Sequence, residues 1–189
     1  MTFLLSATIE PRKGQDIFVR SIALLPAAVR EQCRFLLTGK LWDRHRDFWR
    51  AIQAQMVELP EIEYLGSLDH KSQLRAMAGV NVVVCCSRDE AGSLVAIEAA
   101  MLSKPTILSD HVGIGEVFDQ ESCLRFQSES VSSLASKLMW VFEHQDDLAR
   151  MGLAARRKFE QNLTLEAFGR RFMAIVSKQI GSGTVEDRT

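Results

Sequence analysis

Short apolar runs recur at intervals along this chain, and each is followed by a polar loop and a helical pattern. The runs occupy residues 3–7, 34–37, 62–65, 80–86, 106–108 and 123–126. Because they are almost continuously apolar, they are typical of strands buried on both faces of a parallel sheet. Apolar side chains between the runs recur at helical spacing. The sequence therefore predicts an α/β fold with a parallel sheet of about six strands and helices on both faces.

Helical patterns alone follow the last apolar run. They cover residues 130–142, 148–159 and 165–180. A chain of 189 residues is long enough for one domain with a full core. We therefore expect one domain over residues 1–181, closed by C-terminal helices, and a disordered polar tail over residues 182–189.

Two tryptophans fall in the helical pattern of residues 42–56. Trp42, Trp49, Ile52 and Met56 recur at helical spacing with charged residues between them. We interpret this aromatic pair as a core stripe on one helix, not as a platform for a ligand.

Polar loops that contain glycine follow most of the apolar runs. In a parallel sheet, the loops after the strands meet at the carboxyl ends of the strands, where such folds bind ligands. We therefore expect one binding rim, formed by residues 8–14, 38–41, 66–69, 87–93 and 109–116.

Residues 87–105 combine an anion site with two carboxylates. A polar loop leads here from an apolar run into a helix that should begin near Ser93, after Gly92. Helix N-termini bind anions through unpaired amides and the helix dipole, and glycine lets a phosphate approach the backbone. Glu90 and Glu98 bracket this junction, and carboxylates accept hydrogen bonds well from sugar hydroxyls. This stretch predicts a ligand that carries phosphate and sugar together.

The composition argues against several classes of function. The net charge is −1, which gives no electrostatic footprint for nucleic acid. Cys33, Cys85, Cys86 and Cys123 lack metal-ligand spacing, so we expect buried thiols in a reducing cytoplasm and no metal site. Neither a signal peptide nor an apolar run near the ~20 residues of a membrane span is present. We interpret the basic clusters as solvated helix faces, with a membrane surface or an acidic partner as the alternative; they lie at residues 44–46, 156–158 and 170–171.

Further residues of the same stretch resemble a known family. Glu90 and Glu98 stand with seven residues between them, followed by Ala99-Ala100-Met101 and then by Lys104-Pro105. This pattern resembles the C-terminal, donor-binding domain of family 4 (group 1) glycosyltransferases, which have two Rossmann-like domains in the GT-B arrangement. Other marks follow in the right order and extend the resemblance over about residues 2–180; they are residues 9–14, 64–66 and 113–116.

The resemblance implies a role for each matched residue. Lys13 would bind the donor diphosphate, helped by Arg12, and would stabilise its charge. Glu98 would accept hydrogen bonds from the ribose hydroxyls, and Glu90 would hold the donor sugar. The other implied donor-binding residues are Leu65 and Leu68 near the nucleobase, Gly92, Ser93, Leu94 and Val95 at the helix N-terminus, and also Thr8 and Gly39.

The resemblance also implies a reaction. A retaining transfer of a hexose-type sugar is expected, from a UDP- or GDP-linked donor to a hydroxyl of a glycan or a lipid-linked acceptor. Neither a metal nor a cofactor is expected, because Lys13 and the helix dipole would neutralise the leaving diphosphate. Since the first apolar run begins at residue 3, we expect the acceptor-binding domain to lie outside this sequence and the chain to be inactive alone. We expect a cytoplasmic location, with the inner face of the membrane kept open.

Two alternatives remain open. Thr8 stands where the family usually has arginine, and Ala91-Gly92-Ser93 stands where it has Gly-Phe-Gly. These departures favour a non-catalytic interaction or scaffold module that keeps the fold without the chemistry. A fragment of a sugar-nucleotide epimerase would explain the sheet and the phosphate site, but it fits the two glutamates less well.

Overall fold

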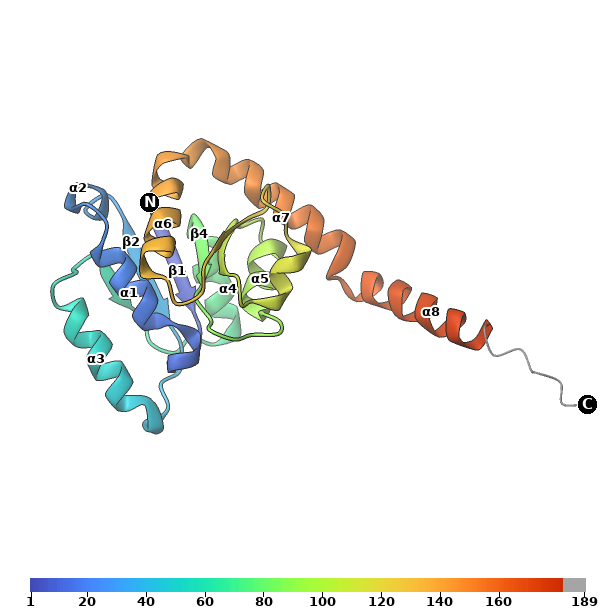
Figure 1. Cartoon of the computed structure of the whole chain (residues 1–189), viewed down its shortest axis with the longest axis horizontal. Coiled ribbons are helices and arrows are strands. Elements are labelled where there is room, and N and C mark those ends of the chain that lie inside the picture. Colours follow the sequence, from blue (N-terminus) through green and yellow to red (C-terminus); the bar gives the residue numbers. More distant parts are fainter. Residues whose placement is uncertain (182–189) are drawn as a thin grey trace, which may run out of the picture.

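The computed structural model describes residues 1–181 and shows the predicted α/β fold (Figure 1). All six strands run parallel, and each overlaps the apolar run that predicted it. They are β1 (Thr2–Ser6), β2 (Arg34–Thr38), β3 (Ile62–Tyr64), β4 (Val82–Cys85), β5 (Thr106–Ser109) and β6 (Cys123–Phe126).

The strand order in the sheet is β3-β2-β1-β4-β5-β6, as in the Rossmann fold. The chain begins in the middle of the sheet, because β1 pairs with β2 on one side and with β4 on the other. The loops after β1 and β4 therefore lead to helices on opposite faces and diverge from each other. Such a switch point leaves a crevice at the carboxyl ends of the strands.

Helices cover both faces of the sheet, as predicted. One face carries α1 (Gln15–Ala23), α3 (Arg46–Met56) and α6 (Val131–Glu143), with α1 in contact with the other two. The other face carries α4 (His70–Ala78), α5 (Leu94–Met101) and α7 (Leu148–Asn162), with α5 in contact with both neighbours. Short elements complete the connections: α2 (Ala27–Arg30), η1 (Pro11–Lys13), η2 (Asp43–His45), η3 (Gly113–Val117) and η4 (Gln145–Asp147).

The core consists of two apolar layers, one on each face of the sheet. Successive side chains of a strand point to opposite faces, so Phe3 and Leu5 of β1 join the layer under α1 and α6, while Leu4 joins the layer under α4 and α5. Phe3 stacks on Phe35 at 5.1 Å between ring centroids, and Phe18 of α1 meets Phe35 edge to face at 6.1 Å. These aromatic contacts join β1, β2 and α1.

The prediction that Trp42 and Trp49 form one buried stripe on a helix is correct for Trp49 and wrong for Trp42. Trp49 lies on α3, is buried and packs against Tyr64. Trp42 instead precedes the helix and is 46% exposed, with the Lys40 amine 4.0 Å from its ring centroid. The reason is that the chain after β2 stays extended, since Leu41 pairs with Ile9 in a parallel bridge. Helix α3 therefore begins only at Arg46.

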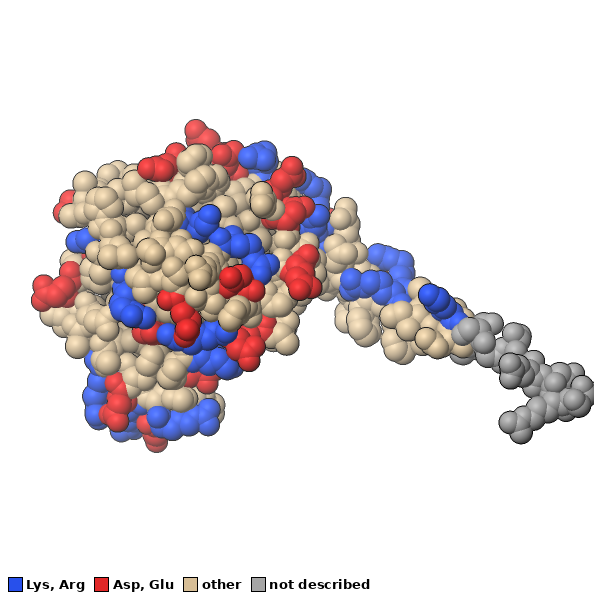
Figure 2. Space-filling view, in the orientation of Figure 1, with Lys and Arg blue, Asp and Glu red and all other residues tan. Residues whose placement is uncertain are grey.

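Helix α8 (Leu165–Gly181) follows α7 and extends away from the body of the molecule (Figures 1 and 2). In the view of Figure 2, acidic and basic side chains are interspersed over the body, and lysines and arginines gather on one side of α8. Within residues 1–181, no helix combines the length and the apolar character that crossing a membrane requires. The predicted disordered tail, residues 182–189, lies outside the described residues. Several large apolar side chains of α8 are exposed: Leu165, Phe168, Phe172, Met173 and Ile175.

Candidate functional site

A cavity of about 490 Å³ opens at the carboxyl ends of β1, β2 and β4, at the switch point of the sheet. The ends of these strands form its floor. The loops after β1, β2, β3 and β4 and the N-terminal turns of α4 and α5 form its walls. Four of the five predicted rim loops line the cavity, whereas the loop of residues 109–116 does not. The volume falls within the range of small-molecule sites, roughly 300–1,000 Å³.

Helix α5 begins at this cavity, where the sequence predicted an anion site. Ser93 is its N-cap: the Ser93 hydroxyl accepts a hydrogen bond from the Ala96 amide at 3.3 Å. This hydroxyl therefore satisfies one of the amides that a helix start leaves without a partner. At Gly92, an added Cβ would meet nothing within 4 Å. The backbone just before α5 is thus open to a bulky group such as a phosphate.

Removing the Ser93 cap is expected to destabilise the domain. In Ser93→Ala, the Ala96 amide loses its acceptor, so we expect the free energy of unfolding to fall by about 1 kcal/mol in urea denaturation. The matched control is Ser136→Ala on α6, whose exposed hydroxyl donates only to the Ser132 carbonyl. An equal loss in both variants would show that Ser93 does not cap α5.

Lys13 and Glu90 form an ion pair in the wall of the cavity. The Lys13 amine lies 2.9 Å from Glu90 Oε2, and the two side chains are only 14% and 13% exposed. The Ser87 hydroxyl donates to the same carboxylate oxygen. Because water is largely excluded, this pair interacts more strongly than an exposed salt bridge does. The positive charge of Lys13 therefore lies in the same cavity as the N-terminus of α5, and the carboxylate of Glu90, which also faces the cavity, holds it there.

Backbone geometry places both members of this pair. Lys13 ends η1, and Gly14 turns the chain directly into α1 with the left-handed angles φ 70° and ψ 27°. Glu90 is held by the loop of residues 109–116: its amide donates to His111 and its carbonyl accepts from Gly113. That loop therefore contributes to the site by supporting Glu90 without lining the cavity.

Glu98 faces the same cavity from the second turn of α5. Its two carboxylate oxygens are bound by side chains of α4, His70 Nε2 at 2.8 Å and Gln73 Nε2 at 3.1 Å. Both partners also line the cavity. The carboxylate is thus oriented and remains partly accessible, with 18% of the side chain exposed. An oriented carboxylate of this kind can accept hydrogen bonds from vicinal hydroxyls.

Most of the residues predicted for the site come together at the cavity. Arg12 does not line it: its guanidinium pairs with Glu10 at 2.9 Å and donates to the Asp89 carbonyl. Leu65 does not line it either. The predicted residues that do are Thr8, Lys13, Gly39, Leu68, Glu90, Gly92, Ser93, Leu94, Val95 and Glu98. Their roles with a ligand stay predictions.

Sequence reasoning missed His70 and Gln73. Both follow the rim loop of residues 66–69, and that position was the only available signal. The pairing with Glu98 arises because α4 and α5 lie side by side on one face of the sheet. Lone histidine and glutamine residues on an amphipathic helix do not reveal such a contact.

The side chains around the cavity suit charge neutralisation and hydroxyl binding. Burial, followed by the negative charge of Glu90, raises the pKa of the Cys85 thiol beneath the cavity. Cys85 therefore stays a neutral thiol and is a poor nucleophile at neutral pH. Among residues 1–181, no group of three or more His, Cys, Asp or Glu side chains is placed to hold a metal ion.

These features define a Rossmann-like α/β domain with its cavity at the switch point. Residues 1–158 match the family model of glycosyl transferases group 1, and the chain belongs to this family. No curated protein sequence matches the chain significantly.

Solved structures of similar fold include larger proteins. HepE from Anabaena, in complex with UDP, has 20% sequence identity and a TM-score of 0.82, with 94% of this chain and 48% of HepE covered. Sucrose-phosphate synthase from Thermosynechococcus elongatus has 21% identity and a TM-score of 0.80, with 96% and 46% covered. The present chain therefore spans about half the length of these two proteins.

One similar structure is a separate domain. It is the C-terminal domain of a glycosyl transferase group 1 family protein, LpcC from Francisella tularensis. Its identity is 18% and its TM-score 0.79, with 87% of this chain and 86% of that domain covered. At these identities, the three likenesses establish the fold.

Proposed function

We propose that this chain is the nucleotide-sugar-binding domain of a glycosyltransferase. The observation that carries this proposal is the convergence of three groups on one cavity: the Lys13–Glu90 ion pair, the N-terminus of α5 and Glu98. A cation and a helix start attract a diphosphate, and two oriented carboxylates accept from sugar hydroxyls. The HepE structures with UDP and with UDP-glucose support a donor of this chemical class.

Each group has a defined part in the proposed reaction. Lys13 and the first amides of α5 bind the diphosphate, and they stabilise the negative charge that grows on it as the bond to the sugar breaks. Glu98, oriented by His70 and Gln73, binds the ribose hydroxyls. Glu90 binds hydroxyls of the donor sugar while its other contacts keep Lys13 in place. The positive charge needed by the leaving group is thus supplied by the chain itself.

The finer assignments are also part of this proposal. The reaction would be a retaining transfer of a hexose-type sugar from a UDP- or GDP-linked donor to a glycan or lipid-linked hydroxyl, within family 4. The chain would form the C-terminal half of a GT-B enzyme, and the acceptor would be bound by a second domain or subunit. Catalysis by this chain alone is therefore not expected, and the cytoplasm, including the inner membrane face, is the proposed location.

Titration calorimetry of the 189-residue chain with UDP, GDP and ADP tests the proposal. We expect binding of at least one of these nucleotides, weakened about tenfold in Glu98→Gln because the neutral amide accepts poorly from the ribose hydroxyls. The matched control is Glu63→Gln at the edge strand β3, which pairs with Arg34 and does not line the cavity. Silence for all three nucleotides at millimolar concentration would favour the non-catalytic scaffold module instead.

A further inference from the structure

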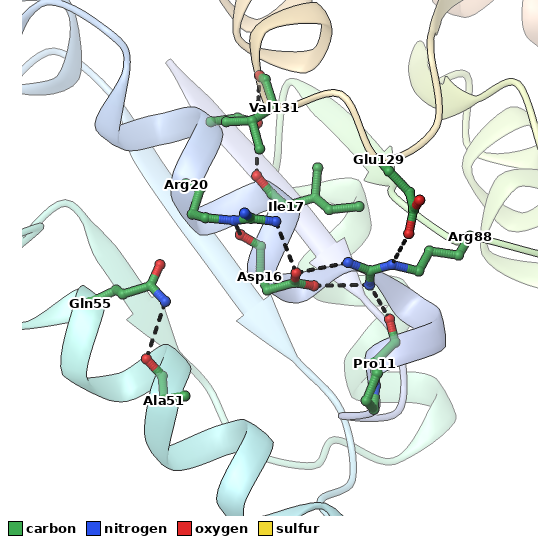
Figure 3. Close-up of polar contacts among 10 residues, drawn as sticks. Pro11, Asp16, Ile17, Arg20, Ala51, Gln55, Arg88, Glu129 and Val131 are labelled. Carbon is green, nitrogen blue, oxygen red and sulfur yellow. Dashed lines mark hydrogen bonds and ion pairs between the residues drawn. The ribbon is translucent and has the colours of Figure 1, made fainter.

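Arg88 connects three segments beside the proposed donor site without lining the cavity (Figure 3). Its guanidinium binds both carboxylate oxygens of Asp16 on α1, at 3.0 and 2.8 Å. It also donates to Glu129 at 2.8 Å and to the carbonyl of Pro11. A planar guanidinium with several fixed donors is suited to hold such a junction.

Two of the three partners flank Lys13 in the chain, and the third precedes α6. Pro11 begins η1, the turn that ends at Lys13. Asp16 lies in the first turn of α1, immediately after that turn. Glu129 precedes the N-cap of α6 and adopts a left-handed backbone, φ 62°, that non-glycine residues seldom adopt.

The backbone strengthens the same junction. The Arg88 amide donates to the Arg12 carbonyl at 2.8 Å, and the Arg12 guanidinium donates back to the Asp89 carbonyl at 3.1 Å. Gly14 packs so closely on the Cys86 carbonyl that there is no room for a Cβ. The second half of the β1–α1 loop, which carries Lys13, is thus docked on the β4–α5 loop, which carries Glu90.

Arg88 is not available as a ligand for a diphosphate. Its donors are directed at Asp16, Glu129 and the Pro11 carbonyl, and the hydrogen bond with Asp16 is the main cause that raises the pKa of its guanidinium. Two carboxylates already balance its charge. Its contribution to the site must therefore act through the position of the loops.

We propose that Arg88 is a positioning residue: by binding Asp16, Glu129 and the Pro11 carbonyl together, it holds Lys13 against Glu90 in the geometry that receives the donor diphosphate. This proposal rests on the proposed function for its ligand. Lys13 has a long, flexible side chain, and fixing its backbone reduces the conformational entropy lost when the diphosphate binds. Asp16 binds Arg88 through two hydrogen bonds and is negatively charged. Its substitution by asparagine therefore changes both the position of Arg88 and the local charge, and the two changes have opposite expected effects on UDP binding.

The sign of the effect of Asp16→Asn separates positioning from simple electrostatics. The substitution removes a negative charge near the cavity, so a long-range field would make UDP bind more tightly. If Arg88 positions Lys13, the weakened anchor makes UDP bind about threefold more weakly. Uridine lacks the diphosphate and should bind both proteins equally. In the Lys13→Ala background, Asp16→Asn should have no further effect on UDP affinity, because the residue it acts through is gone.

Arg20→Ala is the matched control. Arg20 pairs with the same Asp16 carboxylate, at 3.1 Å, and its other hydrogen bond goes to the Asp16 backbone carbonyl. For Arg20→Ala, we expect the ratio of UDP affinity to uridine affinity to stay unchanged. For Asp16→Asn, an unchanged urea midpoint would exclude general unfolding as the cause of the weaker UDP binding. Tighter UDP binding by Asp16→Asn, or an equal loss for uridine, would overturn the proposal.

A measurement without ligand separates this proposal from the proposed function. Hydrogen exchange of the Lys13 and Gly14 amides, which donate to Glu10 and Pro11, should become at least about tenfold faster in Arg88→Met, while β1 amides exchange as before. Unchanged exchange would overturn the positioning role whether or not nucleotides bind. If exchange becomes faster as expected but the unsubstituted chain binds none of UDP, GDP and ADP, the proposed function fails, whereas the role of Arg88 in positioning the loop is retained.

Discussion

Gly14→Ala is expected to destabilise the chain by about 3 kcal/mol, the largest effect we predict for a single methyl group. Gly14 has a left-handed backbone, and an added Cβ would lie 2.2 Å from the carbonyl oxygen of Cys86, which directly follows the central strand β4. The colliding atoms belong to the backbone next to a central strand, so moving them would disrupt the packing of the sheet. Urea denaturation followed by circular dichroism measures the loss.

Gly66→Ala is the matched control for the collision. Gly66 has nearly the same φ, +76°, but an added Cβ there would meet nothing within 4 Å. Its loss should therefore be limited to the left-handed conformation, about 1 kcal/mol. Equal losses at Gly14 and Gly66 would contradict the close packing of Gly14 on Cys86. The difference between the two variants isolates the contact that also places Lys13.

Lys13→Ala should have the largest effect on ligand binding. Removal of a largely buried cation takes away a charge-assisted contact with the diphosphate and leaves Glu90 to repel it, so we expect UDP affinity to fall by about one to two orders of magnitude. Uridine affinity should not change, because its binding does not involve the diphosphate. Stability should fall by only about 1 kcal/mol, since Ser87 still donates to Glu90.

Lys71→Ala is the control for charge in this second experiment. Lys71 lies on α4 next to His70, is exposed and does not line the cavity. Its removal changes the net charge by the same amount, and we expect less than about a twofold effect on UDP. If both lysine variants lose UDP affinity equally, or if Lys13→Ala weakens uridine as much as UDP, Lys13 does not contact the diphosphate. The same titrations with Arg12→Ala would show whether that neighbouring cation contributes from outside the cavity.

Local patterns predicted most of the fold. Apolar runs identified all six strands. The run of the central strand β4 is continuous because a strand buried on both faces has no polar side to interrupt it. The start of α5 near Ser93 was predicted because Gly92 and Ser93 form helices weakly and the residues after them form helices well. Trp42 was misplaced because helical spacing alone does not reveal where the preceding strand stops pairing. The Ile9 to Leu41 bridge, which keeps that segment extended, joins residues far apart in the chain.

The candidate site divides in the same way. Glu90, Glu98 and Lys13 were predicted as site residues, but their partners were not: the salt bridge of Lys13 to Glu90, the binding of Glu98 by His70 and Gln73, and the junction at Arg88. Arg12 and Leu65 were placed in the site by sequence and lie outside the cavity wall. Position along a loop does not decide which of two adjacent side chains, such as Arg12 and Lys13, points inward.

The sequence by itself determined the parallel α/β architecture, the start of α5 and the rim on which polar loops gather. These properties depend on burial patterns and local backbone preferences, which short stretches encode. Only the tertiary structure decided that the β1–α1 loop docks on the β4–α5 loop and that α4 supports Glu98. Those contacts depend on the strand order, which places β4 beside β1 instead of β3, and on close packing around Gly14. Neither the strand order nor the packing around Gly14 can be predicted from one segment of the sequence, because both involve residues far apart in the chain.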